Sequence, residues 1–214
     1  MASCINQIAI AAVQIVMNNT LRHYGALSAY GSDIPIACAG IISKVNQVFM
    51  AICIGISQGS QPIWGFNYGA EKYSRVRQTY RYSVTLCTMI ATIFFICFQF
   101  FPHQIVSIFG NGSDLYFQFA EKYLRIFMLM TFANGIQPMS AGFFTSMGKA
   151  RLGVIMSLTR QVFFLLPLIV IFPFLFGIDG VMYAGPIADT SAFVLAVVFA
   201  RRELGIMKAA EQTV

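Results

Sequence analysis

Residues 153–176 read GVIMSLTRQVFFLLPLIVIFPFLF, an apolar run in which Arg160 is the one charged residue. A helix needs about 20 mostly apolar residues to cross the hydrocarbon core of a bilayer. This run is long enough, and further stretches of the chain share its length and low charge. We expect six transmembrane helices, at about 3–21, 39–63, 80–101, 121–146, 153–176 and 181–200. The sequence therefore predicts an all-α, polytopic membrane helix bundle.

The composition supports a chain solvated by lipid. Hydrophobic residues make up 57% of the 214 residues and charged residues 10%, and the mean hydropathy is +0.70. Soluble domains carry roughly 25% charged residues, so this chain has too few charges to cover a soluble globule. The segments between the apolar runs are short, and we expect residues 1–214 to form a single six-helix lobe.

The positive charges predict an orientation rather than a nucleic-acid surface. The formal net charge is +6, but the cations sit in short clusters between apolar runs and not along a polar face. Cytoplasmic loops are enriched in Lys and Arg. One side of the expected bundle carries most of these residues: Lys72, Arg75, Arg77, Lys149, Arg151, Arg201, Arg202 and Lys208. We expect that side to be cytoplasmic, with both termini on it.

Enzyme and cofactor motifs are missing from the sequence. It has no HExxH, no P-loop, no GxGxxG and no nucleophile elbow. The five cysteines form no CxxC pair, so we expect neither a metal site nor a disulfide framework. The chain is expected not to be an enzyme and to need no cofactor. If the chain transports, the energy should come from an ion gradient or from a partner.

Polar side chains recur on one face of the first two helices. Gln7, Gln14 and Asn18 are spaced by seven and four residues, which places them on one face. The second helix repeats the pattern at positions 47, 50, 54, 57 and 61, including Gln47 and Met50. Carboxamides are costly against lipid, so these faces should line a cavity or form hydrogen bonds between helices. Met50 suits either an adaptable binding surface or ordinary packing.

The fourth helix combines carboxamides with a proline. Asn134 and Gln137 precede Pro138, and Phe143 follows one turn later. Proline removes a backbone donor and kinks a helix. The kink could open a pocket, serve as a bending point, or be a static feature.

Asp189 is the one acid deep within an apolar run. A carboxylate at membrane depth is expensive unless paired, which makes it a functional candidate. Arg160 in the fifth helix is its possible partner, and the two could equally form a structural ion pair.

Residues 55–70 read GISQGSQPIWGFNYGA, and residues 137–149 read QPMSAGFFTSMGK. The first stretch resembles the signature of the multidrug and toxic compound extrusion (MATE) family, and the second is similar to that family's segment before its next cytoplasmic turn. SLTRQ at 157–161 and FGIDG at 176–180 follow in the family's order. In this pattern Gly55 and Gly59 would allow close helix approach, and Pro62 would weaken the second helix near its cytoplasmic end.

The resemblance implies a transporter of two six-helix lobes that rock around a central cavity, driven by inward proton or sodium flow. The motif order resembles the C-terminal lobe, so the chain would pair with an N-terminal lobe or with a second copy. One branch of the family has a cation-binding glutamate in the first helix of this lobe. Gln7, Gln14 and Asn18 stand in that helix without an acid, which argues against that sodium site.

Three functions remain open from the sequence. The first is half of a multidrug efflux antiporter for small lipophilic cationic drugs. The second is a related flippase for lipid-linked sugars, and the third is an inactive or regulatory membrane partner. For the first function, the candidate cavity wall consists of Gln7, Gln14, Asn18, Gln47, Met50, Asn134, Gln137 and Phe143.

Overall fold

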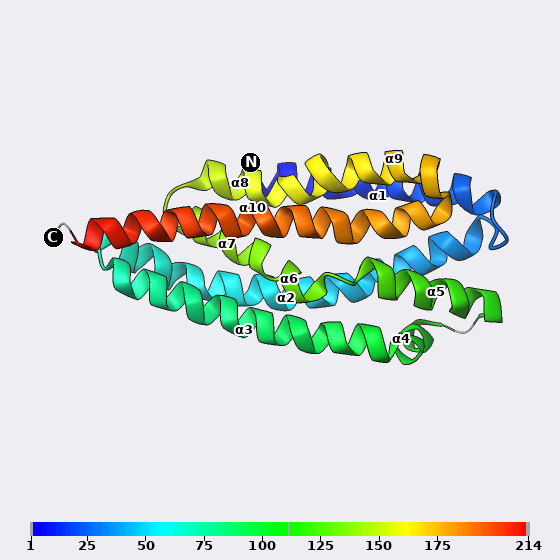
Figure 1. Cartoon of the computed structure of the whole chain (residues 1–214), viewed down its shortest axis with the longest axis horizontal. Helices are drawn as coiled ribbons and strands as arrows, with labels where there is room; N and C mark the ends of the chain where they lie inside the picture. Colours follow the sequence, from blue (N-terminus) through cyan, green and yellow to red (C-terminus); the bar gives the residue numbers. More distant parts are fainter. Residues whose placement is uncertain (1, 111, 213–214) are drawn as a thin grey trace.

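The computed structural model describes residues 2–110 and 112–212, with the side chains of 6–110 and 112–211. The described residues form an elongated bundle whose long helices run side by side along one axis (Figure 1). In chain order the elements are α1 (Ala2–Ala26), α2 (Asp33–Gly69), α3 (Tyr73–Phe100), α4 (Pro102–Phe109), α5 (Asp114–Phe127), α6 (Thr131–Asn134), α7 (Ile136–Ser146), α8 (Ala150–Leu158), the π-helix η1 (Thr159–Leu165), α9 (Leu166–Phe176) and α10 (Ile178–Gln212).

Four helices are long and apolar enough to cross a membrane. They are α2, α3, the continuous series α8–η1–α9, and α10. Two further segments of the expected bundle do not meet that criterion within the described residues. They are α1 and the fourth segment, which is divided among α5, α6 and α7. The fold is an all-helical membrane bundle.

The expected continuous helix at 121–146 is wrong. The chain leaves α-helical geometry at 128–130, and the helix is interrupted again at Gly135, which forms a turn although its backbone dihedrals stay in the α region. Pro138 accounts for the second interruption, because it has no N–H to donate to the carbonyl of Asn134, where α6 ends. In α7, Pro138 occupies the first turn, where a backbone N–H has no partner within the helix. The break therefore falls one turn before the proline itself.

Other helix bounds also differ from those expected. The segment after α3 contains α4, which begins at Pro102, a residue suited to the first position of a helix. α2 continues past Pro62 to Gly69. α10 continues to Gln212, and its last turns are held by two ion pairs, Lys149–Glu203 and Arg77–Glu211. The C-terminal end of α10 is thereby tied to α3 and to the turn before α8.

An aromatic cluster joins α2, α3 and α7 in the core. Trp64 and Phe143 meet edge to face with ring centroids 5.5 Å apart, and Tyr80 lies 4.4 Å from Phe143. The Tyr80 hydroxyl forms a 2.9 Å hydrogen bond with Ser140. Trp64 and Phe143 are completely buried. Because aromatic side chains contribute large buried areas, this cluster determines how the broken fourth segment packs on α2 and α3.

α2 and α7 lie in close contact at Gly142. The Ser57 hydroxyl of α2 donates a 3.0 Å hydrogen bond to the carbonyl of Pro138 on α7. A Cβ on Gly142 would collide with that Ser57 hydroxyl. Gly142 is therefore required by the contact between the two helices.

Gly142→Ala is expected to lower the free energy of unfolding by about 1–3 kcal/mol, the usual cost of overpacking a core. Gly59→Ala is the matched control, since a Cβ there meets nothing within 4 Å. It should be neutral or raise stability by about 0.5–1 kcal/mol through helix propensity. Thermal unfolding of the purified chain in detergent measures both. Equal effects of the two substitutions would contradict the close contact at Gly142.

Candidate functional site

A cavity of about 670 Å³ lies between α1, α2, α7, α8 and η1. Its wall is rich in carboxamides and also carries hydroxyl and methionine side chains. The carboxamides are Asn6, Gln7, Gln14, Asn46, Gln47, Gln58, Gln61, Gln137 and Gln161. Each can both donate and accept hydrogen bonds, so these nine side chains offer many polar contacts without carrying a charge.

The face of α1 that carries Gln7 and Gln14 borders the cavity, because residues seven apart return to one side of a helix. The Gln14 amide donates a 3.4 Å hydrogen bond to Asn18. Asn18 itself is half-buried and does not line the cavity. α1 thus contributes two of the three carboxamides expected from it, and the third supports Gln14.

One face of α2, which carries Gln47, Ser57 and Gln61, borders the same cavity. The structure places its five positions, 47, 50, 54, 57 and 61, on the cavity wall. Met50 is half-buried and also packs against the core, while Gln47 is exposed. The flexible side chain of Met50 therefore lies between the core and the cavity.

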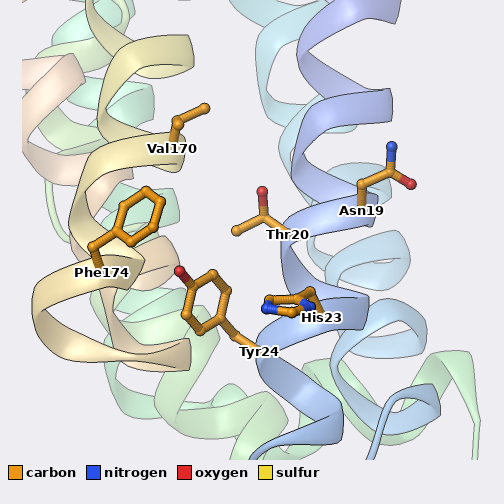
Figure 2. Close-up of a pocket in the computed structure, with 6 residues that line it drawn as sticks. All are labelled: Asn19, Thr20, His23, Tyr24, Val170 and Phe174. Carbon is orange, nitrogen blue, oxygen red and sulfur yellow. The ribbon is translucent and has the colours of Figure 1, made fainter.

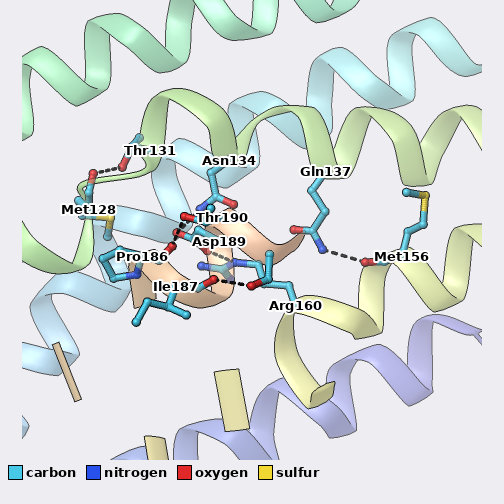
Figure 3. Close-up of polar contacts among 11 residues, drawn as sticks. Met128, Thr131, Asn134, Gln137, Met156, Arg160, Pro186, Ile187, Asp189 and Thr190 are labelled. Carbon is cyan, nitrogen blue, oxygen red and sulfur yellow. Dashed lines mark hydrogen bonds and ion pairs between the residues drawn. The ribbon is translucent and has the colours of Figure 1, made fainter. Parts of the chain in front are cut away.

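The broken fourth segment contributes Gln137 and Pro138 to the wall. The Gln137 amide donates a 2.8 Å hydrogen bond to the carbonyl of Met156, which joins α7 to α8 (Figure 3). Phe143 does not line the cavity, because it is enclosed in the aromatic cluster with Trp64 and Tyr80. The prediction that Phe143 belongs to the cavity wall is therefore wrong.

Asn134 also lies behind the wall rather than on it. It is buried, and its amide donates a 2.9 Å hydrogen bond to Asp189 Oδ2 on α10. Asp189 Oδ1 accepts from Arg160 Nε in a buried ion pair. Figure 3 shows the three side chains converging from α6, α10 and η1. Asn134 is therefore connected to the cavity through Asp189 and Arg160.

Arg160 reaches the cavity from the π-helical segment. η1 ends at Leu165, two residues before Pro167, which cannot donate an N–H to the carbonyl of Phe163. π-helical turns of this kind are frequent at functional sites. Among the described residues that line the cavity, Arg160 alone carries a charge.

Some wall residues lie outside the candidate set drawn from the sequence. Asn6 accepts a 2.9 Å hydrogen bond from the Ser157 hydroxyl, linking α1 to α8. Asn46 holds a buried Oδ1 without a hydrogen-bond donor in the structure. Gln58 and Gln161 could have been found, because they stand within the family-like stretches at 55–70 and 157–161.

The glycine and proline candidates of α2 lie off the cavity. The expectation that Gly55 and Gly59 allow close helix approach is wrong for this lobe, since added Cβ atoms would meet nothing within 4 Å. Pro62 is exposed inside α2, which continues beyond it. Over the described residues, no group of three or more His, Cys, Asp or Glu side chains could hold a metal ion.

A second, smaller hollow of about 300 Å³ lies between α1 and α9 (Figure 2). It is lined by Asn19, Thr20, His23, Tyr24, Val170 and Phe174. The Tyr24 ring is 5.1 Å from His23 and 6.4 Å from Phe174, centroid to centroid. This hollow shares no lining residue with the carboxamide cavity.

A helical membrane bundle with a polar cavity between discontinuous helices is the architecture of a membrane transporter. The family model MatE matches residues 2–171. The chain therefore belongs to the MatE family of transporters, and it is not an enzyme.

Curated relatives agree with this assignment. The chain is 26% identical over 183 residues to the multidrug export protein MepA of Staphylococcus aureus (strain MSSA476), covering 86% of this chain and 38% of MepA. It is 28% identical over 174 residues to MepA of Staphylococcus haemolyticus (strain JCSC1435), covering 80% of this chain and 37% of that protein. The chain thus spans less than half the length of these relatives.

Solved structures share the fold. An outward-facing MATE family multidrug resistance transporter matches with a TM-score of 0.86 and 16% identity, over 97% of this chain and 46% of that one. An inward-facing structure gives 0.86 and 15% identity, over 97% and 47%. The fold of this chain is therefore similar to about half of a MATE transporter in both states.

Proposed function

We propose that this chain is one half of a secondary active multidrug efflux antiporter. It would export small lipophilic organic cations in exchange for protons or sodium ions by alternating access. The observation that carries this proposal is the carboxamide cavity of about 670 Å³ in a chain that belongs to the MatE family. Ligand sites of this kind combine apolar walls with a few polar groups that orient the ligand.

The other half would be an N-terminal six-helix lobe or a second copy of this chain. The family-like stretches stand in the order of a C-terminal lobe. The equal similarity of this fold to outward-facing and inward-facing transporters supports a lobe that moves as a rigid body. A cation in the cavity would need a carboxylate from the other lobe, because the described wall of this one carries none.

The proposed orientation places both termini in the cytoplasm of a bacterial-type inner membrane. The turn between α2 and α3 and the turn between α7 and α8 lie at the same end of the bundle as the C-terminus (Figure 1). Both turns and the end of α10 carry the clustered Lys and Arg residues, as the positive-inside rule requires of a cytoplasmic side.

Complementation in an efflux-deficient bacterium tests the proposed function. The chain is expressed alone and together with a matching N-terminal lobe, with membrane levels measured in each case. We expect resistance to lipophilic cationic drugs only when both halves are present. Resistance from the chain alone would show that it assembles and couples without the other lobe. Normal insertion without resistance in either case would favour the inactive partner or the flippase.

Gln14→Ala is expected to lower resistance in the two-half assay by about fivefold to tenfold, the effect of losing one hydrogen bond of about 1 kcal/mol. Asn19→Ala on the same helix is the matched control, because Asn19 is exposed and lies in the other hollow. Membrane levels should be unchanged in both. Equal resistance of the two variants would remove Gln14 from the ligand-binding wall.

A further inference from the structure

We infer that Arg160 is an anion-recognising residue of this cavity and that it binds the carboxylate of a zwitterionic substrate. The inference rests on the proposed transport function and narrows its organic cations to those that also carry a carboxylate. Its starting point is the polarity of the wall, on which the guanidinium of Arg160 is the one charged group among the described residues. The carboxamides around the cavity can add hydrogen bonds to the same ligand group.

The contact between Arg160 and Asp189 leaves part of the guanidinium for a ligand. Asp189 meets Arg160 through Nε and Oδ1. Its second oxygen, Oδ2, accepts from Asn134 instead, at 2.9 Å. The pair is therefore not the two-pronged fork in which a carboxylate occupies two guanidinium nitrogens. A guanidinium has five N–H donors, and those on its two Nη atoms remain for a carboxylate in the cavity.

Asn134 and Asp189 hold Arg160 in this orientation. Asp189 is 3% exposed and does not line the cavity, so it contacts the guanidinium from within the bundle. A carboxylate in the cavity would be nearer to the guanidinium than to Asp189. Attraction to the nearer charge then exceeds repulsion by the farther one, because the Coulomb energy falls with distance. Asn134 and Asp189 are thus positioning residues for Arg160.

The cationic part of the substrate follows from the proposed function, which names organic cations. An organic cation that also carries a carboxylate is a zwitterion, and its carboxylate can accept from the Nη donors of Arg160.

A pair of fluorescent dyes tests this recognition directly. Rhodamine 110 carries a free carboxylate, and rhodamine 123 is its methyl ester. Binding of each dye to the purified 214-residue chain in nanodiscs is measured by fluorescence anisotropy. We expect the chain to bind rhodamine 110 more tightly than rhodamine 123. Arg160→Gln/Asp189→Asn should remove this preference and weaken rhodamine 110 binding about 10- to 100-fold, the range for hydrogen bonds to a charged group.

The double variant is used because it removes both charges of the pair and so avoids an unpaired buried charge. Lys122→Gln/Asp179→Asn is the matched control. It neutralises another ion pair of the chain, with a 2.6 Å contact, that does not line the cavity. This control should keep the preference for rhodamine 110.

Three outcomes would overturn the inference: no binding of either dye to the unmodified chain, equal binding of both dyes, or a preference that survives in the Arg160→Gln/Asp189→Asn variant. The measurement needs neither an ion gradient nor the other lobe. A failed inference can therefore accompany successful two-half complementation, and a failed complementation can accompany selective dye binding.

Discussion

Asp189→Ala is expected to lower the free energy of unfolding by about 3–5 kcal/mol, the cost of breaking a buried ion pair by removing one partner. The substitution leaves the Arg160 guanidinium buried, with 5% of the residue exposed, and without its carboxylate. It also leaves the Asn134 amide without its acceptor. Equilibrium unfolding of the purified chain in detergent, followed by circular dichroism, measures the loss.

Two further variants distinguish the cost of leaving Arg160 buried without its carboxylate from the general effects of a substitution. Asp179→Ala removes the acid of the partly exposed Lys122–Asp179 pair, where a loss of at most about 1 kcal/mol is expected. Arg160→Met/Asp189→Leu replaces both members of the buried pair with apolar groups and should recover most of the stability lost by Asp189→Ala. If Asp189→Ala costs no more than Asp179→Ala, the pair contributes little to the fold.

Phe143→Ala should be comparably destabilising, by about 3–5 kcal/mol, because it empties a fully buried aromatic site. Phe143 contacts Trp64, Tyr80 and Phe144. Its loss opens a void between α2, α3 and α7. The shift in the unfolding midpoint and the fluorescence of Trp64, the one tryptophan of the sequence, both report the change.

Phe66→Ala is the control for this substitution. Phe66 is 74% exposed and stands two residues after Trp64 on the same helix. Its truncation should change stability by no more than about 0.5 kcal/mol, the usual range for surface positions. A Phe143→Ala variant that kept its stability and lost ligand binding would return Phe143 to the cavity wall.

The destabilising substitutions have a consequence for resistance assays. Asp189→Ala and Phe143→Ala are expected to reduce the amount of folded protein in the membrane, since a change of about 1–2 kcal/mol already alters abundance severalfold. Lost resistance in these variants therefore does not show lost ligand contact. Gln14→Ala avoids this ambiguity, because Gln14 is only half-buried and its hydrogen-bond partner Asn18 is half-buried too.

Most of the long helices and part of the cavity wall could be predicted from the sequence alone. Helical periodicity places every third or fourth residue on one face, so the spacing of positions 47, 50, 54, 57 and 61 is sufficient to group them on one face, which the structure places on the cavity wall. The low charge content and the clustered cations determined the membrane class, because the energetic cost of a charge in hydrocarbon is large and local in the sequence.

How the helices pack against each other determined which of the candidate residues face the cavity and which lie behind it. In a membrane, faces turned to lipid and faces turned to the core are both apolar, so the sequence does not distinguish a buried Phe143 from a cavity residue. Asn134, Arg160 and Asp189 come from three separate helical segments. Only the arrangement of α6, η1 and α10 brings them together and turns Arg160 to the cavity while Asp189 stays behind it. Periodicity describes one helix at a time, whereas this site depends on how several helices are rotated against each other.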